Sequence, residues 1–160
     1  MPYADPSAAT DSLATTATRL LEAIEAAEPR LLALGETAAG ARRGPGKWSA
    51  KQILGHLLDS ASNNHQRFVR AASGEPFKGP GYAQEHWVAC QHYDQRPWVA
   101  LVAFWVAYNG HLAHVLSHYP EQHRSVPCEI GGGPPVTLEF VARDYVGHIR
   151  HHLTQVLGQG

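Results

Sequence analysis

The sequence predicts an all-α protein built as a four-helix bundle. Three observations support this: apolar residues recur at helical spacing in four long stretches, glycine- and proline-rich segments separate those stretches, and no internal repeat or low-complexity tract indicates another architecture. The chain has 160 residues, which suffices for one hydrophobic core but not comfortably for two. We therefore expect a single domain over residues 1–160, with about residues 1–9 as a flexible N-terminus.

The first helix is expected from about Asp11 to Leu34, where leucine and isoleucine residues form one apolar stripe. Pro29 lies inside this stretch and should kink or split the helix, because proline lacks the amide hydrogen of the helical hydrogen bond. The following segment from Gly35 to Lys47 contains GARRGPGK and is predicted to be a loop.

The second helix has the clearest start signal in the chain. Ser49 is the predicted N-cap, and Gln52 three positions later is its partner in a capping box. Trp48 is placed to pack against Ile53 across this first turn. The helix should continue to about Ser73, where a glycine and a proline follow.

A long connection, from Gly74 to Gln95, precedes the third helix and contains a predicted short helix near residues 84–91. The third helix should open after Asp94 with Pro97 in its first turn and stop before Pro120. The segment VPCEIGGGPPVTL then indicates a short hairpin or an irregular turn. The fourth helix is expected to be capped by Thr137 and to end at Gly158.

Charge and hydropathy exclude several classes of partner. The chain has 13 Lys and Arg against 14 Asp and Glu, so its formal charge of -1 gives no reason to expect nucleic acid or an anionic membrane as partner. No uninterrupted apolar run approaches the roughly 20 residues that span a bilayer, and the start of the chain does not resemble a signal peptide. A cytoplasmic, soluble protein is the expectation.

The cysteine and tryptophan residues are expected to be structural. Cys90 and Cys128 lie far apart and outside any CxxC spacing, so we predict two free thiols that are buried or partly buried. Aromatic side chains could wall a pocket, but most tryptophans should belong to the core; the candidates are Trp48, Trp87, Trp98 and Trp105.

Histidine is the unusual residue type, with 11 copies scattered along the chain. His148 and His152 lie four residues apart in the predicted fourth helix, so their imidazoles share one face, about 6 Å apart along the axis. Two rings placed in this way can bind one metal ion, whereas His151 turns further toward solvent. Because HxxxH also arises by chance, this spacing alone leaves metal binding and an ordinary polar flank equally open.

A second HxxxH pair, His114 and His118, lies in the predicted third helix. His114 falls opposite that helix's apolar stripe, and His118 lies in the last turn, where a cationic side chain stabilises the helix dipole. We therefore predict that this pair is not a metal site.

His56 borders the apolar face of the second helix and interrupts an otherwise well-formed amphipathic pattern. A lone histidine at such a position is more often a hydrogen-bonded core residue than a metal ligand. His56 could share a metal ion with His148 and His152 only if the three lie at the same height along the bundle. It lies about 10 Å into the second helix, whereas His148 and His152 lie about 9 to 15 Å from the end of the fourth. These levels match only if the two helices are antiparallel. The long connection permits this by crossing between helices 2 and 3, which gives an up-down-down-up bundle.

The stretches KWSAKQILGHLLD and DYVGHIRHHLTQV resemble the DinB/YfiT-like family of metal-binding four-helix bundles, and the resemblance covers the chain from about Trp48 onward. It implies an up-down-down-up fold, a homodimer, and a metal triad of His56, His148 and His152. Family members include thiol-dependent transferases, isomerases and hydrolases. The resemblance therefore implies an enzyme that transfers a small thiol to an electrophile or hydrolyses a small substrate.

Three neutral imidazoles with an open fourth position are typical of a catalytic zinc site, and nickel fits the same donors. Such an ion can activate bound water or a low-molecular-weight thiol co-substrate. Helical position suggests four residues that hold the outer ring nitrogens, with surface salt bridging as an equal alternative for the aspartates; they are Asp59, Ser60, Asp144 and Tyr145. We expect a metal-dependent enzyme acting on a small molecule, and a non-catalytic metal- or ligand-binding bundle is the alternative.

Overall fold

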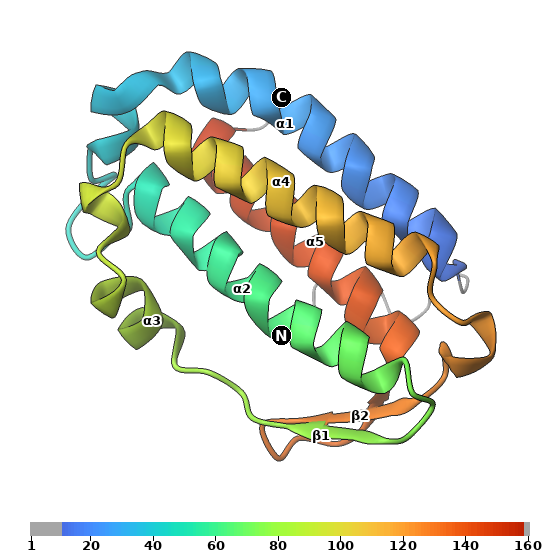
Figure 1. Cartoon of the computed structure of the whole chain (residues 1–160). Coiled ribbons are helices and arrows are strands. Elements are labelled where there is room, and N and C mark those ends of the chain that lie inside the picture. Colours follow the sequence, from blue (N-terminus) through green and yellow to red (C-terminus); the bar gives the residue numbers. More distant parts are fainter. Residues whose placement is uncertain (1–10, 159–160) are drawn as a thin grey trace.

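Four long helices packed as a bundle form the body of the computed structural model, which describes residues 11–158 (Figure 1). They are α1 (Leu13–Gly40), α2 (Ala50–Ala71), α4 (Trp98–Ser117) and α5 (Leu138–Leu157). The predicted fold class is confirmed. The flexible N-terminus expected over residues 1–9 lies outside the described residues.

The helices follow the predicted up-down-down-up order. Helices α1 and α5 run in one direction along the bundle, and α2 and α4 run in the other (Figure 1). Both α1 and α2 pack against α4 and α5. Helices α2 and α5 are therefore antiparallel neighbours, which is the arrangement that the levels of the histidines require.

Helix α1 breaks at Gly35, so the prediction of a break at Pro29 is wrong. Gly35 has φ 75° and ψ 165°, and helical structure resumes beyond this kink as far as Gly40. Pro29 is exposed, so water can reach the carbonyl group that its missing amide hydrogen leaves without a donor. The predicted loop consequently begins at Ala41, after one further helical turn.

Glu36 anchors the helical turn that follows this kink. One carboxylate oxygen of Glu36 accepts a hydrogen bond from the backbone N–H of Trp98 at 2.7 Å, where α4 begins. The other oxygen pairs with Lys51 in the first turn of α2. Because Lys51 is buried, this pair ties the end of α1 to the starts of α2 and α4.

The predicted helix starts are confirmed at α2 and α5. Ser49 Oγ accepts from the N–H of Gln52 at 3.3 Å, and Gln52 Oε1 accepts from the N–H of Ser49 at 3.0 Å, which completes the capping box. Thr137 caps α5 by accepting from the N–H of Phe140. Helix α4 differs slightly, since Pro97 is its N-cap and not a residue of its first turn.

The connection between α2 and α4 runs back along the bundle (Figure 1) and contains β1 (Phe77–Gly79) and the predicted short helix α3 (Gln84–Cys90). Strand β1 was not predicted. It pairs in parallel with β2 (Pro127–Ile130), and β2 pairs antiparallel with β3 (Val136–Thr137), which confirms the predicted hairpin. The part of the chain that the structure describes also contains two single 3-10 turns, Tyr93–Gln95 and Glu121–His123.

The tryptophans and the cysteines differ in how deeply they are buried. Trp98 and Trp105 are fully buried, as predicted, whereas Trp48 and Trp87 are only partly buried. Both cysteines are free thiols, and Cys128 is buried; the prediction of burial is wrong for the other. Cys90 is exposed because α3 lies on the outside of α2 and buries only Val88.

One helix among the described residues, α4, is long and apolar enough to span a membrane. This is weak evidence, because the core helix of a bundle has the same length and composition. Leu101, Trp105 and Leu112 of α4 are buried against the neighbouring helices. The apolar character of α4 therefore has an explanation within the bundle.

Candidate metal centre

Three histidine side chains converge between α2 and α5. His56 comes from the second turn of α2, and His148 and His152 come from the last part of α5. The ring nitrogens that could bind a metal all lie within 4.8 Å of one another, and the Nε2 atoms of His56 and His148 are 3.0 Å apart. The structure thus brings together the three residues that the sequence indicated.

The outer nitrogens of two rings have hydrogen-bond partners. Ser60 Oγ lies 3.3 Å from Nδ1 of His148, and Gln155 Oε1 lies 2.8 Å from Nδ1 of His152. Because an amide oxygen only accepts, His152 carries its proton on Nδ1 and has its lone pair on Nε2. Nδ1 of His56 is buried, with no hydrogen-bond partner among the described residues. The partners of the outer nitrogens therefore favour Nε2 as the binding atom.

Burial keeps these imidazoles neutral. Burial, with a smaller contribution from the neighbouring imidazoles, lowers the pKa of His56 to about 4 and that of His148 to about 3. Burial also lowers the pKa of His152, although its hydrogen bond with Gln155 acts in the opposite direction. A neutral imidazole keeps a lone pair, so the cluster can bind a cation at neutral pH.

This donor set fits a divalent late first-row ion. Three neutral imidazoles supply three of the four ligands of a tetrahedral site. With zinc–nitrogen distances near 2.0–2.1 Å, two ligands of a tetrahedral ion are about 3.4 Å apart. The ring nitrogens of this cluster lie within 4.8 Å of one another, so the rings would draw together by up to about 1.4 Å when an ion binds. Within residues 11–158, no carboxylate or thiolate joins the cluster.

Ser60 and Gln155 contact the outer nitrogens of two rings of the triad and orient them. Ser60 was predicted, since it lies one turn after His56 on the same face of α2. Gln155 was not predicted, although its position three residues after His152 was a usable signal. A glutamine at an exposed helical position is common, so that spacing does not distinguish a supporting residue from a surface one.

Two of the predicted supporting residues form hydrogen bonds elsewhere. Asp59 accepts from the hydroxyl of Tyr93 at 2.6 Å and from the side-chain amide of Gln91. The hydroxyl of Tyr145 donates to Asn109 in the core. Both side chains are therefore hydrogen-bonded to residues that do not belong to the triad.

Asp144, the fourth predicted supporting residue, lines a pocket beside the triad. Its carboxylate favours the charged form of Arg67, which lines the same pocket. The structure therefore places Asp144 at the cavity wall, near a cation.

The remaining histidines of the two HxxxH segments lie on the surface. His114 and His118 are exposed on α4, with ring centroids 4.3 Å apart, and no third donor from the described residues joins them. Nδ1 of His118 lies 2.9 Å from the backbone oxygen of His114, as in a helix C-terminus. His151 is also exposed, as its position on the helix predicted.

Two pockets flank the triad. The inner pocket, of about 420 Å³, lies between α2, α5 and the small sheet and reaches His56 and His148. The outer pocket, of about 650 Å³, reaches Trp48, whose ring centroid is 5.3 Å from that of His56. It also reaches Gln155, the partner of His152. Gln84 lines both pockets, so they adjoin at the start of α3.

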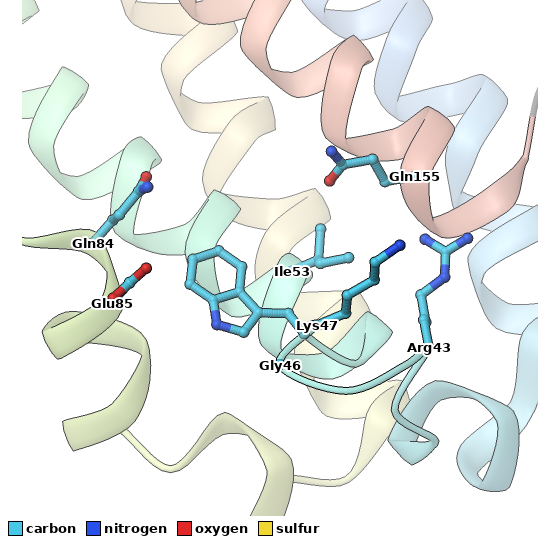
Figure 2. Close-up of a pocket in the computed structure, with 8 residues that line it drawn as sticks. Arg43, Gly46, Lys47, Ile53, Gln84, Glu85 and Gln155 are labelled. Carbon is cyan, nitrogen blue, oxygen red and sulfur yellow. The ribbon is translucent and has the colours of Figure 1, made fainter.

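The outer pocket is polar and open to solvent. Figure 2 shows Arg43 and Lys47 on one side of it and Gln84 and Glu85 on the other, with Ile53 between them. The first two residues come from the loop before α2, and the acidic residue comes from α3. Two basic groups against one acidic group give this pocket an excess of positive charge.

A family model described as the DinB superfamily matches residues 19–156, which is most of the chain. The chain belongs to the DinB superfamily. No curated protein matches it in sequence. The resemblance seen in the segments around His56 and His148 is thereby confirmed at the level of the family.

Among solved structures, this chain is similar to YfiT from Bacillus subtilis, with a TM-score of 0.82 at 18% sequence identity. The match covers 96% of this chain and 88% of the other. YfiT is described as a probable metal-dependent hydrolase with an unusual four-helix bundle topology. At this identity the similarity establishes the fold, and it agrees with the up-down-down-up order observed here.

The lowered pKa values predict that the metal-free protein loses stability in mild acid. In the unfolded chain each histidine is protonated near pH 6.5, whereas folded His56 and His148 remain neutral down to about pH 4 and about pH 3. The unfolded state thus binds more protons in this window. The free energy of unfolding should fall as the pH falls from about 6.5, by up to about 1.4 kcal/mol per pH unit for each histidine.

Urea unfolding in the presence of a chelator, at about pH 7.5 and about pH 5, measures this loss. Replacing His148 with leucine should reduce the difference between the two pH values, because one of the two depressed groups is gone. His114→Ala should leave it unchanged, since that side chain is exposed. Equal stability of the wild type at both pH values would show that the imidazoles are not desolvated as described.

Proposed function

We propose that this protein is a metal-dependent enzyme that binds one divalent ion, zinc or nickel, through His56, His148 and His152 and acts on a small molecule. The observation that supports this is the convergence of three neutral imidazoles beside two pockets. A purely structural zinc site is usually closed by a fourth protein ligand. No described residue supplies one, which supports a site open to substrate.

A divalent ion held by these residues would lower the pKa of a bound water or thiol toward neutrality and so supply a nucleophile. The chain's own groups have separate tasks. Ser60 and Gln155 orient the rings of His148 and His152 through their outer nitrogens. Ile130 and Val136, from the small sheet, give the inner pocket an apolar part of its wall.

The two adjoining pockets favour transfer of a thiol over hydrolysis. Hydrolysis needs one organic substrate and water, for which a single pocket suffices, whereas thiol transfer needs two organic molecules at one centre. We propose that the outer pocket, with Arg43 and Lys47, holds an anionic low-molecular-weight thiol and that the inner pocket holds the electrophile. The sulfur–carbon bond would form as the bond to the leaving group breaks, and the thiol proton would leave with that group.

Hydrolysis of a small ester or amide is the second candidate, and the description of YfiT as a probable metal-dependent hydrolase supports it. One screen separates the two. The protein is assayed with chlorodinitrobenzene in the presence and absence of cysteine or glutathione, and with p-nitrophenyl esters and anilides without thiol. We expect turnover that requires the thiol, disappears on chelation and returns when metal is added.

The matched variants are His152→Ala, which removes a proposed ligand, and His114→Ala, which alters an exposed surface position. Only the first should abolish turnover while the protein remains folded. Activity that survived both chelation and His152→Ala would assign the reaction to another part of the protein. Ester hydrolysis without any thiol would favour the second candidate.

A further inference from the structure

The inner pocket contains one cationic side chain, Arg67, at the end away from the triad. Arg67 lies 11 residues after His56 on α2, which is about three helical turns, so both residues are on the same face. We propose that Arg67 binds a carboxylate at one end of a substrate whose other end reacts at the triad. This inference rests on the proposed function and names its substrate class, a small carboxylic acid.

The face of α2 between these residues lines the pocket continuously. Ser60 and Asn64 follow His56 at intervals of four residues, and Arg67 comes three residues later; all four line the inner pocket. Helical side chains tilt toward the helix N-terminus, so the long side chain of Arg67 leans toward His56. A single elongated molecule lying along this face would reach both ends of the pocket.

Arg67 is partly buried, and the described residues offer its guanidinium one side-chain hydrogen bond and the nearby charge of Asp144. Its Nη1 donates to Oδ1 of Asn64 at 3.2 Å, which uses one of the five guanidinium N–H groups. Burial lowers the pKa of Arg67 because the charged form is less well solvated there. An anionic ligand would compensate this desolvation, and a carboxylate matches the planar guanidinium through two parallel hydrogen bonds.

The charges of the pocket favour a monoanion. Asp144 lines the same pocket and favours the charged form of Arg67, so the pocket has one negative and one positive group. A phosphate group, with a charge near -2, would meet more repulsion from Asp144 than a carboxylate would. A divalent ion at the triad would add positive charge at the other end, so an anionic substrate is attracted to the pocket as a whole.

Part of the pocket wall is apolar. Ile130 of β2, Val136 of β3 and Phe140 of α5 line it opposite the polar face of α2. A hydrocarbon segment of the substrate would bury its surface against them. The cavity volume, about 420 Å³, lies within the usual range for small-molecule sites. The pocket therefore fits a carboxylic acid with an apolar middle and a reactive group at its far end.

Monohydroxamates of linear dicarboxylic acids test this inference without a catalytic assay. The hydroxamate binds a metal ion, and the carboxylate at the other end reaches a distance set by the chain length. Binding of each acid and of its methyl ester to the metal-loaded protein is measured by titration calorimetry. At one chain length, the acid should bind at least about tenfold more tightly than the ester, as expected for hydrogen bonds to a charged group.

The preference for the acid should disappear in Arg67→Gln. It should be reduced in Arg67→Lys, which keeps the positive charge but cannot donate two parallel hydrogen bonds to one carboxylate. The second variant also serves if the first does not fold, and metal content confirms that each variant retains the triad. The matched control is Arg70→Gln, an exposed arginine one turn later on α2 that does not line the inner pocket, which should keep the wild-type preference.

The outcomes separate the two proposals. Equal binding of acid and ester at every chain length, or a preference that persists in Arg67→Gln, would overturn the role of Arg67 and leave the metal site intact. Tighter binding of a phosphonate-tailed hydroxamate would overturn the assignment to carboxylates. Failure of the wild type to bind metal or any hydroxamate would instead overturn the proposed function, and this inference with it.

Discussion

Replacing His56, His148 or His152 with alanine is expected to remove the approximately one metal ion that the purified protein should carry. Two imidazoles remain in each variant, and they cannot hold an ion as three do. Even residues that only orient a ligand cost about 10–100-fold in metal affinity, so loss of a ligand should cost on the order of 100-fold or more. Elemental analysis after gel filtration, with competition against a chromogenic chelator, measures both stoichiometry and affinity.

His114→Ala and His118→Ala are the matched controls, because they remove the other HxxxH pair from an exposed helix face. Their metal content should equal that of the wild type. Ser60→Ala should give an intermediate result, about tenfold weaker binding, because it frees the outer nitrogen of His148 without removing a ligand. Loss of metal in the control pair, with retention in the triad variants, would place the site elsewhere.

Gly55→Ala is expected to destabilise the protein by about 1–3 kcal/mol, although alanine is the better helix former by about 1 kcal/mol. A Cβ atom at position 55 would lie only 2.0 Å from Cδ2 of Tyr93. The ring cannot simply move aside, because its hydroxyl donates to Asp59 one turn further along α2. Urea or thermal unfolding measures the change in the free energy of unfolding.

Gly110 provides the comparison for this variant. It lies inside α4, and a Cβ atom built there meets nothing within 4 Å. Gly110→Ala should therefore stabilise the protein by about 1 kcal/mol through helix propensity alone. If Gly55→Ala stabilised the protein to the same extent, the close packing of Tyr93 on α2 would be wrong.

The sequence predicts those parts of the fold that depend on short-range chemistry. The caps at Ser49 and Thr137 were predictable because the residues that form them lie three positions apart. Pro29 was a misleading signal, since the cost of a proline in a helix depends on whether water reaches the carbonyl group that loses its donor. Strand β1 was missed because three residues carry no alternation, and a partner about 50 residues away stabilises the strand.

The candidate site was predictable to a similar degree. The spacing of four residues predicts that His148 and His152 bind together. His56 joins them once the heights of the three residues along the bundle are compared. The hydrogen bond from Tyr93 to Asp59 was not predictable, because it depends on how the long connection folds back onto α2. For the same reason, the sequence pattern gave no indication that Arg67 and Asp144 would line one pocket.

The connection between α2 and α4 also separates two properties of the site. The proposed ligands lie on α2 and α5, which the core holds in place, whereas Tyr82 and two residues of α3, Gln84 and Glu85, line the pockets. Substitutions in this connecting segment can therefore change which molecule is accepted without moving any proposed ligand. A bundle built in this way can vary the walls of its pockets while the three histidines keep their places on the helices.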